Sequence, residues 1–147
     1  MVKKLENDAV FDNFGQGINC CMQVFSAVAE EIGFSEVEAK KIGAGFGGGM
    51  GLGGTCGCVT GALMAIGCKY GNFEPGQTVE MELFNGKKKE FLDEFRAQVG
   101  DTQCIELLGG LNPAVPEQKA QIVEKGLMKT ICAPAVCTTV EILEEIL

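Results

Sequence analysis

The chain has 147 residues, of which 46% are hydrophobic and 22% charged, so its composition is that of one globular domain over residues 1–147. Its formal net charge of −8 argues against nucleic-acid binding, which depends on phosphate contacts from Lys and Arg. No segment predicts a membrane span or a signal peptide. We therefore expect a cytoplasmic protein whose eight cysteines are free, catalytic or metal-bound rather than joined in disulfides.

Helix signals begin near residue 19. Asn19 is placed to cap a helix over residues 20–32, which Gly33 would end. A serine followed three residues later by a glutamate forms a capping box that opens residues 35–42 as a short helix. The first third of the chain therefore predicts two helices in succession.

A glycine-rich run over residues 43–54 comes next, and it contains eight glycines. Glycine loses more conformational entropy on folding than any other residue, so such a run indicates left-handed turns or a close approach of the backbone. Thr55 is then placed to cap a helix over residues 57–70 that is apolar on nearly all sides. We expect this helix to be the central buried one, with Gly61 and Gly67 allowing a neighbouring helix to pack closely.

The second half of the chain also predicts helices, with no alternating pattern that favours a sheet. They are expected over residues 78–99 with a kink or break at Asn85-Gly86, then over 103–108, 116–125 and 133–146. The fold class expected is all-α. We predict a compact bundle of about five to seven helices around the central glycine-containing helix.

Four cysteines lie in or just before the first turn of a predicted helix: Cys20, Cys56, Cys104 and Cys132. Unpaired N–H groups and the positive end of the helix dipole favour an anion there. A thiol in that position has a lowered pKa, and the thiolate is both the nucleophile and the metal ligand. Because the chain has no histidine, a site built from these thiols must take its positive potential from helix ends.

The remaining cysteines are interpreted as core residues: Cys21, Cys58, Cys68 and Cys137. On a continuous helix, Cys58 would point roughly 200° away from Cys56 and would not face the same centre. Cys68 is placed deep in the apolar helix over residues 57–70. Whether any of these four takes part in the site is left open.

Several blocks of the sequence match one family pattern: Gly17–Cys20, Gly45–Gly51, Gly54–Gly57, Val59–Leu63, Cys104–Gly109, Cys132–Val136 and Glu141–Glu145. With these blocks the chain resembles the redox-active proteins named for their C_GCAxxG_C_C cysteine pattern. Members are small helical bacterial and archaeal proteins, many beside transport genes. The resemblance implies that the signature cysteines are Cys20, Cys56, Cys104 and Cys132. Cys21 and Cys58 stand where the family has alanine.

Two kinds of chemistry fit these thiols. In the first, Cys20, Cys56, Cys104 and Cys132 bind a metal centre that transfers electrons. A [2Fe–2S] or [4Fe–4S] cluster is favoured, and zinc or no metal remains open. Backbone beside Cys56, at Gly54, Thr55 and Gly57, is then expected to contact the cofactor.

In the second kind of chemistry, Cys56 is the attacking thiolate of a thiol–disulfide cycle without metal, and another of the four cysteines resolves it. A helical adaptor with no chemistry is the third alternative, so enzymatic activity is left open. The resemblance implies a redox partner protein and a link to a transport system, and base rates for soluble proteins allow a homodimer.

Overall fold

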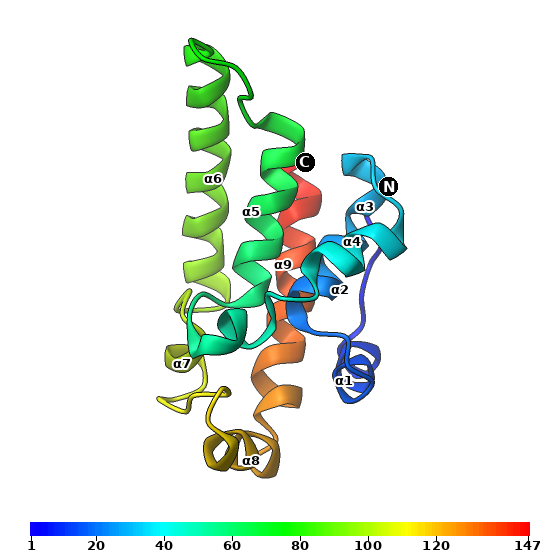
Figure 1. Cartoon of the computed structure of the whole chain (residues 1–147), viewed down its shortest axis with the longest axis vertical. Helices are drawn as coiled ribbons and strands as arrows, with labels where there is room; N and C mark the ends of the chain where they lie inside the picture. The colour runs from blue at the N-terminus through cyan, green and yellow to red at the C-terminus, as the bar shows by residue number, and fades with distance from the viewer.

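A computed structural model describes all residues from 1 to 147 and contains nine α-helices and no strand (Figure 1). The helices are α1 (Asn7–Gly15), α2 (Cys20–Ala27), α3 (Ala29–Ile32), α4 (Glu36–Gly43), α5 (Gly57–Tyr70), α6 (Thr78–Gln98), α7 (Cys104–Leu107), α8 (Pro116–Glu124) and α9 (Ala133–Ile146). Two short turns of π type complete them: η1 (Gly49–Gly53) and η2 (Met128–Cys132). The all-α prediction is confirmed.

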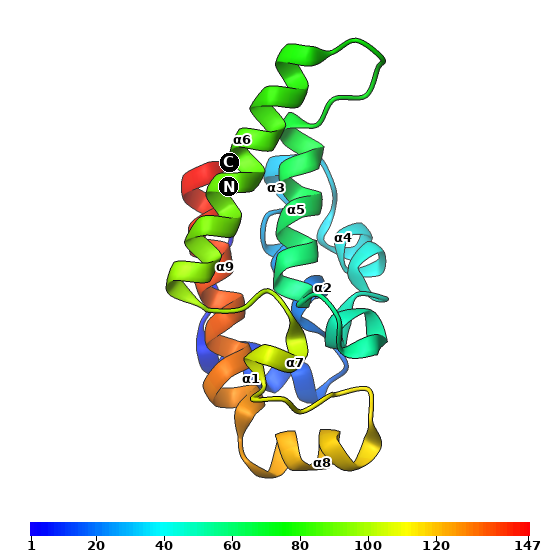
Figure 2. The ribbon, with the colours of Figure 1, turned by 90° about the vertical axis from the view of Figure 1, so that its left-hand side faces the viewer.

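Helix α5 lies at the centre of the bundle, as its apolar sequence predicts. It contacts α2, α3, α6 and α9, and Figure 1 shows it between α6 and the group formed by α2 and α9. The buried core joins side chains from α5, such as Ile66, to Phe25 of α2, Phe91 of α6 and Val136 of α9. Helix α8 lies across the end of the bundle opposite the loop between α5 and α6 (Figure 2).

Glycines of α5 allow α2 to pack directly against it. A Cβ atom on Gly57 would lie only 2.9 Å from the backbone nitrogen of Cys21, and one on Gly61 would lie 3.3 Å from the Cys21 carbonyl oxygen. Real Cβ atoms do not approach backbone as closely as 2.9 Å, so glycine is required at position 57. The N-terminal ends of α2 and α5, which carry Cys20 and Cys56, therefore come together.

Most of the predicted helix boundaries are confirmed. The Asn19 side chain accepts a hydrogen bond from the Met22 N–H at 2.9 Å and caps α2. Ser35 and Glu38 form the predicted capping box. Gly33 follows α3 in the left-handed conformation, with φ of 84°. Helices α5 and α9 span the predicted residues.

Other boundaries differ from the sequence prediction. Residues 20–32 divide into α2 and α3, because Val28 leaves the helical conformation at φ −107° and ψ 7°. Helix α1 adds a further element, so there are more helices than the five to seven expected. The residue that caps α5 is Cys56 and not Thr55, because Thr55 pairs with Gln103 instead.

The break expected at Asn85-Gly86 is wrong. Helix α6 runs without interruption for 21 residues, from Thr78 to Gln98. Glycine inside a helix costs about 1 kcal/mol relative to alanine, and a long helix held by buried Phe91 and Phe95 tolerates that cost. Local propensity is therefore overridden by packing in α6.

None of the helices is by itself long and apolar enough to cross a bilayer. Only α8 and the segment Met128–Ile146 taken together reach that length and composition, and they are bent by 72°.

The surroundings of Gly57 and Gly86 predict that glycine-to-alanine changes at these two positions have opposite effects on the free energy of unfolding. Gly57→Ala pushes a methyl group against backbone, and such overpacking typically destabilises by about 1–3 kcal/mol. Gly86→Ala adds a methyl group to open space inside α6 and is expected to stabilise by about 0.5–1 kcal/mol. Urea unfolding of both variants checks the pair. A Gly57→Ala protein as stable as the parent would contradict the close packing.

Candidate functional site

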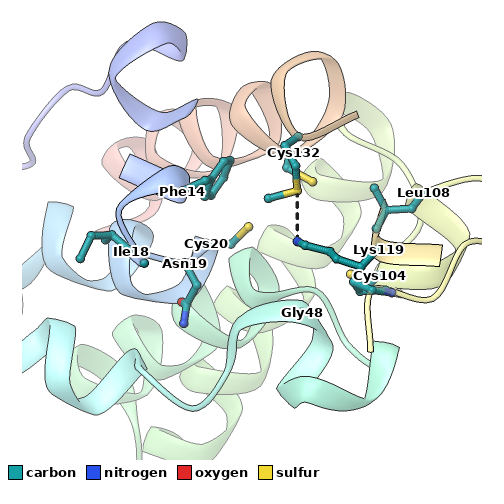
Figure 3. Close-up of a pocket in the computed structure, with 12 residues that line it drawn as sticks. Phe14, Ile18, Asn19, Cys20, Gly48, Cys104, Leu108, Lys119 and Cys132 are labelled. Carbon is teal, nitrogen blue, oxygen red and sulfur yellow. Dashed lines mark hydrogen bonds between the residues drawn. The ribbon is translucent and has the colours of Figure 1, made fainter. Parts of the chain in front are cut away.

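Three of the four candidate cysteines line one cavity at the end of the bundle near α8. The cavity has a volume of about 190 Å³, and Cys20, Cys104 and Cys132 reach it from α2, α7 and η2 (Figure 3). The rest of its lining is Phe14, Gly17, Ile18, Asn19, Gly48, Leu108, Pro113, Lys119 and Met128. Segments far apart in the sequence thus bring thiols to one largely apolar space.

A two-residue antiparallel bridge holds Cys56 close to Cys104. The Cys56 N–H donates to the Thr102 carbonyl at 2.8 Å, and the Cys104 N–H donates to the Gly54 carbonyl at 2.7 Å. Thr55 and Gln103 are the paired residues between these bonds. Because successive side chains of extended backbone point to opposite faces, Cys56 and Cys104 share the face away from Thr55 and Gln103.

The glycine run before this bridge forms a left-handed turn. Gly48, Gly49 and Gly51 have φ angles of 63°, 64° and 70°, and Met50 between them has φ of 61°. Left-handed backbone costs about 1–2 kcal/mol for a residue with a Cβ, so glycine at the neighbouring positions makes the turn accessible. The turn places Gly48 in the wall of the cavity.

The glycine run also contacts the N-terminal end of α2. The Asn19 amide donates to the Ala44 carbonyl at 3.0 Å, and a Cβ on Gly47 would lie 2.4 Å from the Asn19 Cβ. The glycine run therefore packs directly over the cap of α2. This contact fixes the position of Cys20 relative to the left-handed turn.

Of the four candidate cysteines, Cys56 has a pKa that the structure lowers. The neighbouring Cys58 thiol is the largest cause of the lowered pKa, and the backbone N–H groups of Cys58 and Val59 at the start of α5 act in the same direction, against the effect of burial. The helix-start argument from sequence therefore holds for Cys56.

The prediction that a helix N-terminus lowers the pKa of a thiol is wrong for two other cysteines. Burial raises the pKa of Cys104 to about 12, with further contributions from Cys56 and Cys20, and α7 has only four residues. Cys132 does not lie at a helix start, because η2 continues into α9 with Cys132 in right-handed helical conformation. Burial raises its pKa above the ordinary range, and nearby Cys20, Cys56 and Cys104 add to the effect.

The effects of neighbouring thiols on the pKa values of Cys104 and Cys132 indicate that the four sulfurs lie in one region. The thiols of Cys20 and Cys56 influence both Cys104 and Cys132, and the Lys119 ammonium favours the thiolate form of the latter two. Cys56 itself is 6% exposed and is not among the residues that line the cavity.

Cys58 lies closer to the candidate site than the sequence indicated. It is fully buried, as expected of a core residue, but its thiol faces the sulfurs of both Cys20 and Cys56, and these contacts with burial raise its pKa well above the ordinary value. Helical geometry does not separate Cys56 from Cys58, because Cys56 has φ −54° and ψ 137° and precedes the helix. The sequence signal that could have identified Cys58 is its position two residues after Cys56, the residue that caps α5.

The other cysteines lie outside the cavity. Cys21 is buried where α2 meets Gly61 of α5, and burial raises its pKa to about 11. The prediction that Cys68 is deep in the core is wrong. It is exposed, because it lies in the last turn of α5, where the neighbouring Lys69 is exposed as well. Cys137 is half-buried on α9.

The thiols surround a space rather than converge on a point. All eight cysteines are free, and no group of three or more Cys, Asp or Glu side chains is spaced to hold a single metal ion. Of the backbone expected to contact a cofactor, Gly54 and Thr55 belong to the bridge and Gly57 to the contact with α2. None of these three residues lines the cavity.

The fold and the cavity define a small all-α protein with a cavity lined by cysteine thiols. The chain belongs to the family described as "Putative redox-active protein (C_GCAxxG_C_C)", whose model matches residues 18–146. The resemblance drawn from the sequence is thereby confirmed. No curated protein and no solved structure matches the chain at a significant level.

The burial of the cysteines predicts their order of alkylation. In reduced, folded protein, iodoacetamide should modify exposed Cys68 well before Cys21 and Cys58, which are both fully buried. Peptide mass spectrometry over a time course measures the order, and Cys68→Ser should remove the fast phase. Early modification of Cys58 would contradict the packing of α5 against α2.

Proposed function

We propose that Cys20, Cys56, Cys104 and Cys132 hold an iron–sulfur cluster and that the protein transfers electrons through it. The observation that carries the proposal is the cavity of about 190 Å³ lined by three of these cysteines from three separate segments. The fourth, Cys56, is joined to Cys104 by the bridge at Thr55 and Gln103.

The donor set suits a group of several atoms better than a single ion. A zinc ion requires four ligands that converge at about 2.3 Å from one point, and no such group of side chains exists here. Iron–sulfur clusters are held by thiolates placed around a larger volume, commonly by four cysteines. When bound, the cluster would supply one-electron transfer.

The surroundings of the cavity fit an anionic centre shielded from water. Phe14, Ile18, Leu108 and Pro113 give it an apolar wall, and Lys119 is the positively charged side chain that lines it. Hydrogen bonds, local charge and solvent exposure are the features by which a protein adjusts a cluster potential. In this chain, the Lys119 ammonium and the apolar wall would have that role.

Metal analysis of cysteine variants tests the proposal. Anaerobically purified protein should contain iron and acid-labile sulfide and absorb visible light. Serine in place of Cys20, Cys56, Cys104 or Cys132 should lower the iron content at least about tenfold, because each change removes a ligand.

Cys68→Ser is the matched control and should keep its iron, because Cys68 is exposed and remote from the cavity. Zinc in place of iron would contradict electron transfer. Protein that takes up no metal even after anaerobic reconstitution with iron and sulfide would overturn the cluster.

A second candidate function is thiol–disulfide exchange, and the contact between Cys56 and Cys58 favours it. The Cys56 thiolate would attack a substrate disulfide and displace one sulfur as a thiolate. Cys58 would then lose its proton and displace the second sulfur. The products would be a Cys56–Cys58 disulfide and two substrate thiols, so the substrate gains the two electrons that the cysteines lose.

Cys58→Ala separates the two candidates. A cluster held by the other four cysteines should survive this change, because the family has alanine at that position. The disulfide cycle should be abolished, which thiol counting after equilibration at a series of redox potentials would measure. An unchanged thiol count in the parent protein over that series would exclude the exchange reaction.

A further inference from the structure

A second cavity lies directly beside the cysteine cavity. It has a volume of about 360 Å³ and is lined by Phe11, Asp12, Phe14, Gly15, Lys119, Val123, Gly126 and Met128. Phe14, Lys119 and Met128 line both cavities. Because these side chains form a shared wall, a molecule in the second cavity would lie at the boundary of the thiol site.

The Lys119 ammonium in this shared wall has no anionic partner. It contacts the thioether sulfur of Met128 at 3.8 Å, marked by the dashed line in Figure 3, and none of the ion pairs of the protein includes it. The side chain is half-buried and points into the space between the cysteines (Figure 3). A partly desolvated ammonium in this position favours an anion, since charge-assisted hydrogen bonds are about twice as strong as neutral ones.

With Lys119 included, two positive charges and one negative charge lie at the second cavity. Asp12 lines it but is exposed to solvent, which screens its carboxylate. Lys129 lies over the ring of Phe11 with its nitrogen 5.9 Å from the ring centroid, and so adds a second positive charge at the rim. In a chain with a net charge of −8, this is a local reversal of sign.

We propose that the second cavity binds a small organic anion with an apolar body, whose charged group pairs with Lys119. The body would lie among Phe11, Phe14 and Val123, and the anion would be the small-molecule substrate or electron carrier of the cysteine site. The inference therefore rests on the proposed redox function for its role, while its binding site stands on the cavity and on Lys119.

Two fluorescent probes with the same aromatic body test the inference. 8-Anilinonaphthalene-1-sulfonate carries one negative charge, and N-phenyl-1-naphthylamine is neutral. Lys119→Gln should weaken binding of the sulfonate about tenfold, the effect of losing one charge-assisted contact, and leave the neutral probe within about twofold. Lys125→Gln, which removes an equal charge just after the same helix, should leave both affinities unchanged.

Two further changes keep the test decisive if Lys119→Gln disturbs the fold. Val123→Glu places a negative charge in the second cavity at an exposed helix position and should also weaken the sulfonate. Val37→Glu, at an exposed position on α4, is its control. Asp12→Asn should strengthen sulfonate binding, because it removes the opposing carboxylate.

Equal effects of Lys119→Gln and Lys125→Gln on the sulfonate would overturn the inference, as would insensitivity to Val123→Glu. Its failure is distinguishable from failure of the cluster, because probe binding is read by fluorescence and iron by chemical analysis. Iron-containing protein with sulfonate binding independent of Lys119 would overturn the anion site alone. Iron-free protein with Lys119-dependent binding would overturn the cluster alone.

Discussion

The constraint on which the site depends is the backbone contact between the starts of α2 and α5. Gly57 has no room for a Cβ against Cys21, so the two helices meet at their N-terminal ends. That contact places Cys20 beside Cys56 and Cys58, although α2, α3, α4 and the glycine run separate the first from the others in the sequence. A larger residue at Gly57 would push the start of α5 away from α2 and so move these thiols apart.

The sequence predicted the fold well wherever local chemistry decided it. Asn19, Ser35 and Gly33 carry short-range capping signals, and the structure uses each of them. Prediction failed where distant residues decide. Thr55 looks like a cap, but it takes part in the tertiary bridge to Gln103, and the capping residue of α5 is Cys56 instead. The packing of Phe91 and Phe95 likewise keeps α6 intact across Asn85-Gly86.

The sequence selected cysteines that the fold brings into one region, but it did not predict their electrostatics or the nearby Cys58. The rule that helix starts lower the pKa of a thiol identified Cys56, yet burial dominates at Cys104 and Cys132 and reverses the direction. Burial is a property of the folded chain, and no spacing in the sequence reveals it. The same holds for Lys119, an unremarkable lysine of α8 until the fold brings it to the thiols.

The bridge at Thr55 and Gln103 also bears on which part of the molecule can open locally. Helix α7 packs chiefly against η1. Its Cys104 N–H donates to the Gly54 carbonyl of the glycine run, and the Cys56 N–H donates to the Thr102 carbonyl just before α7. Local openings in proteins follow such weakly held units, whose exchange with solvent deuterium is fast relative to the core. An opening of α7 would separate Cys104 from the other thiols while the bundle stays folded, and a group bound among the thiols would slow that opening.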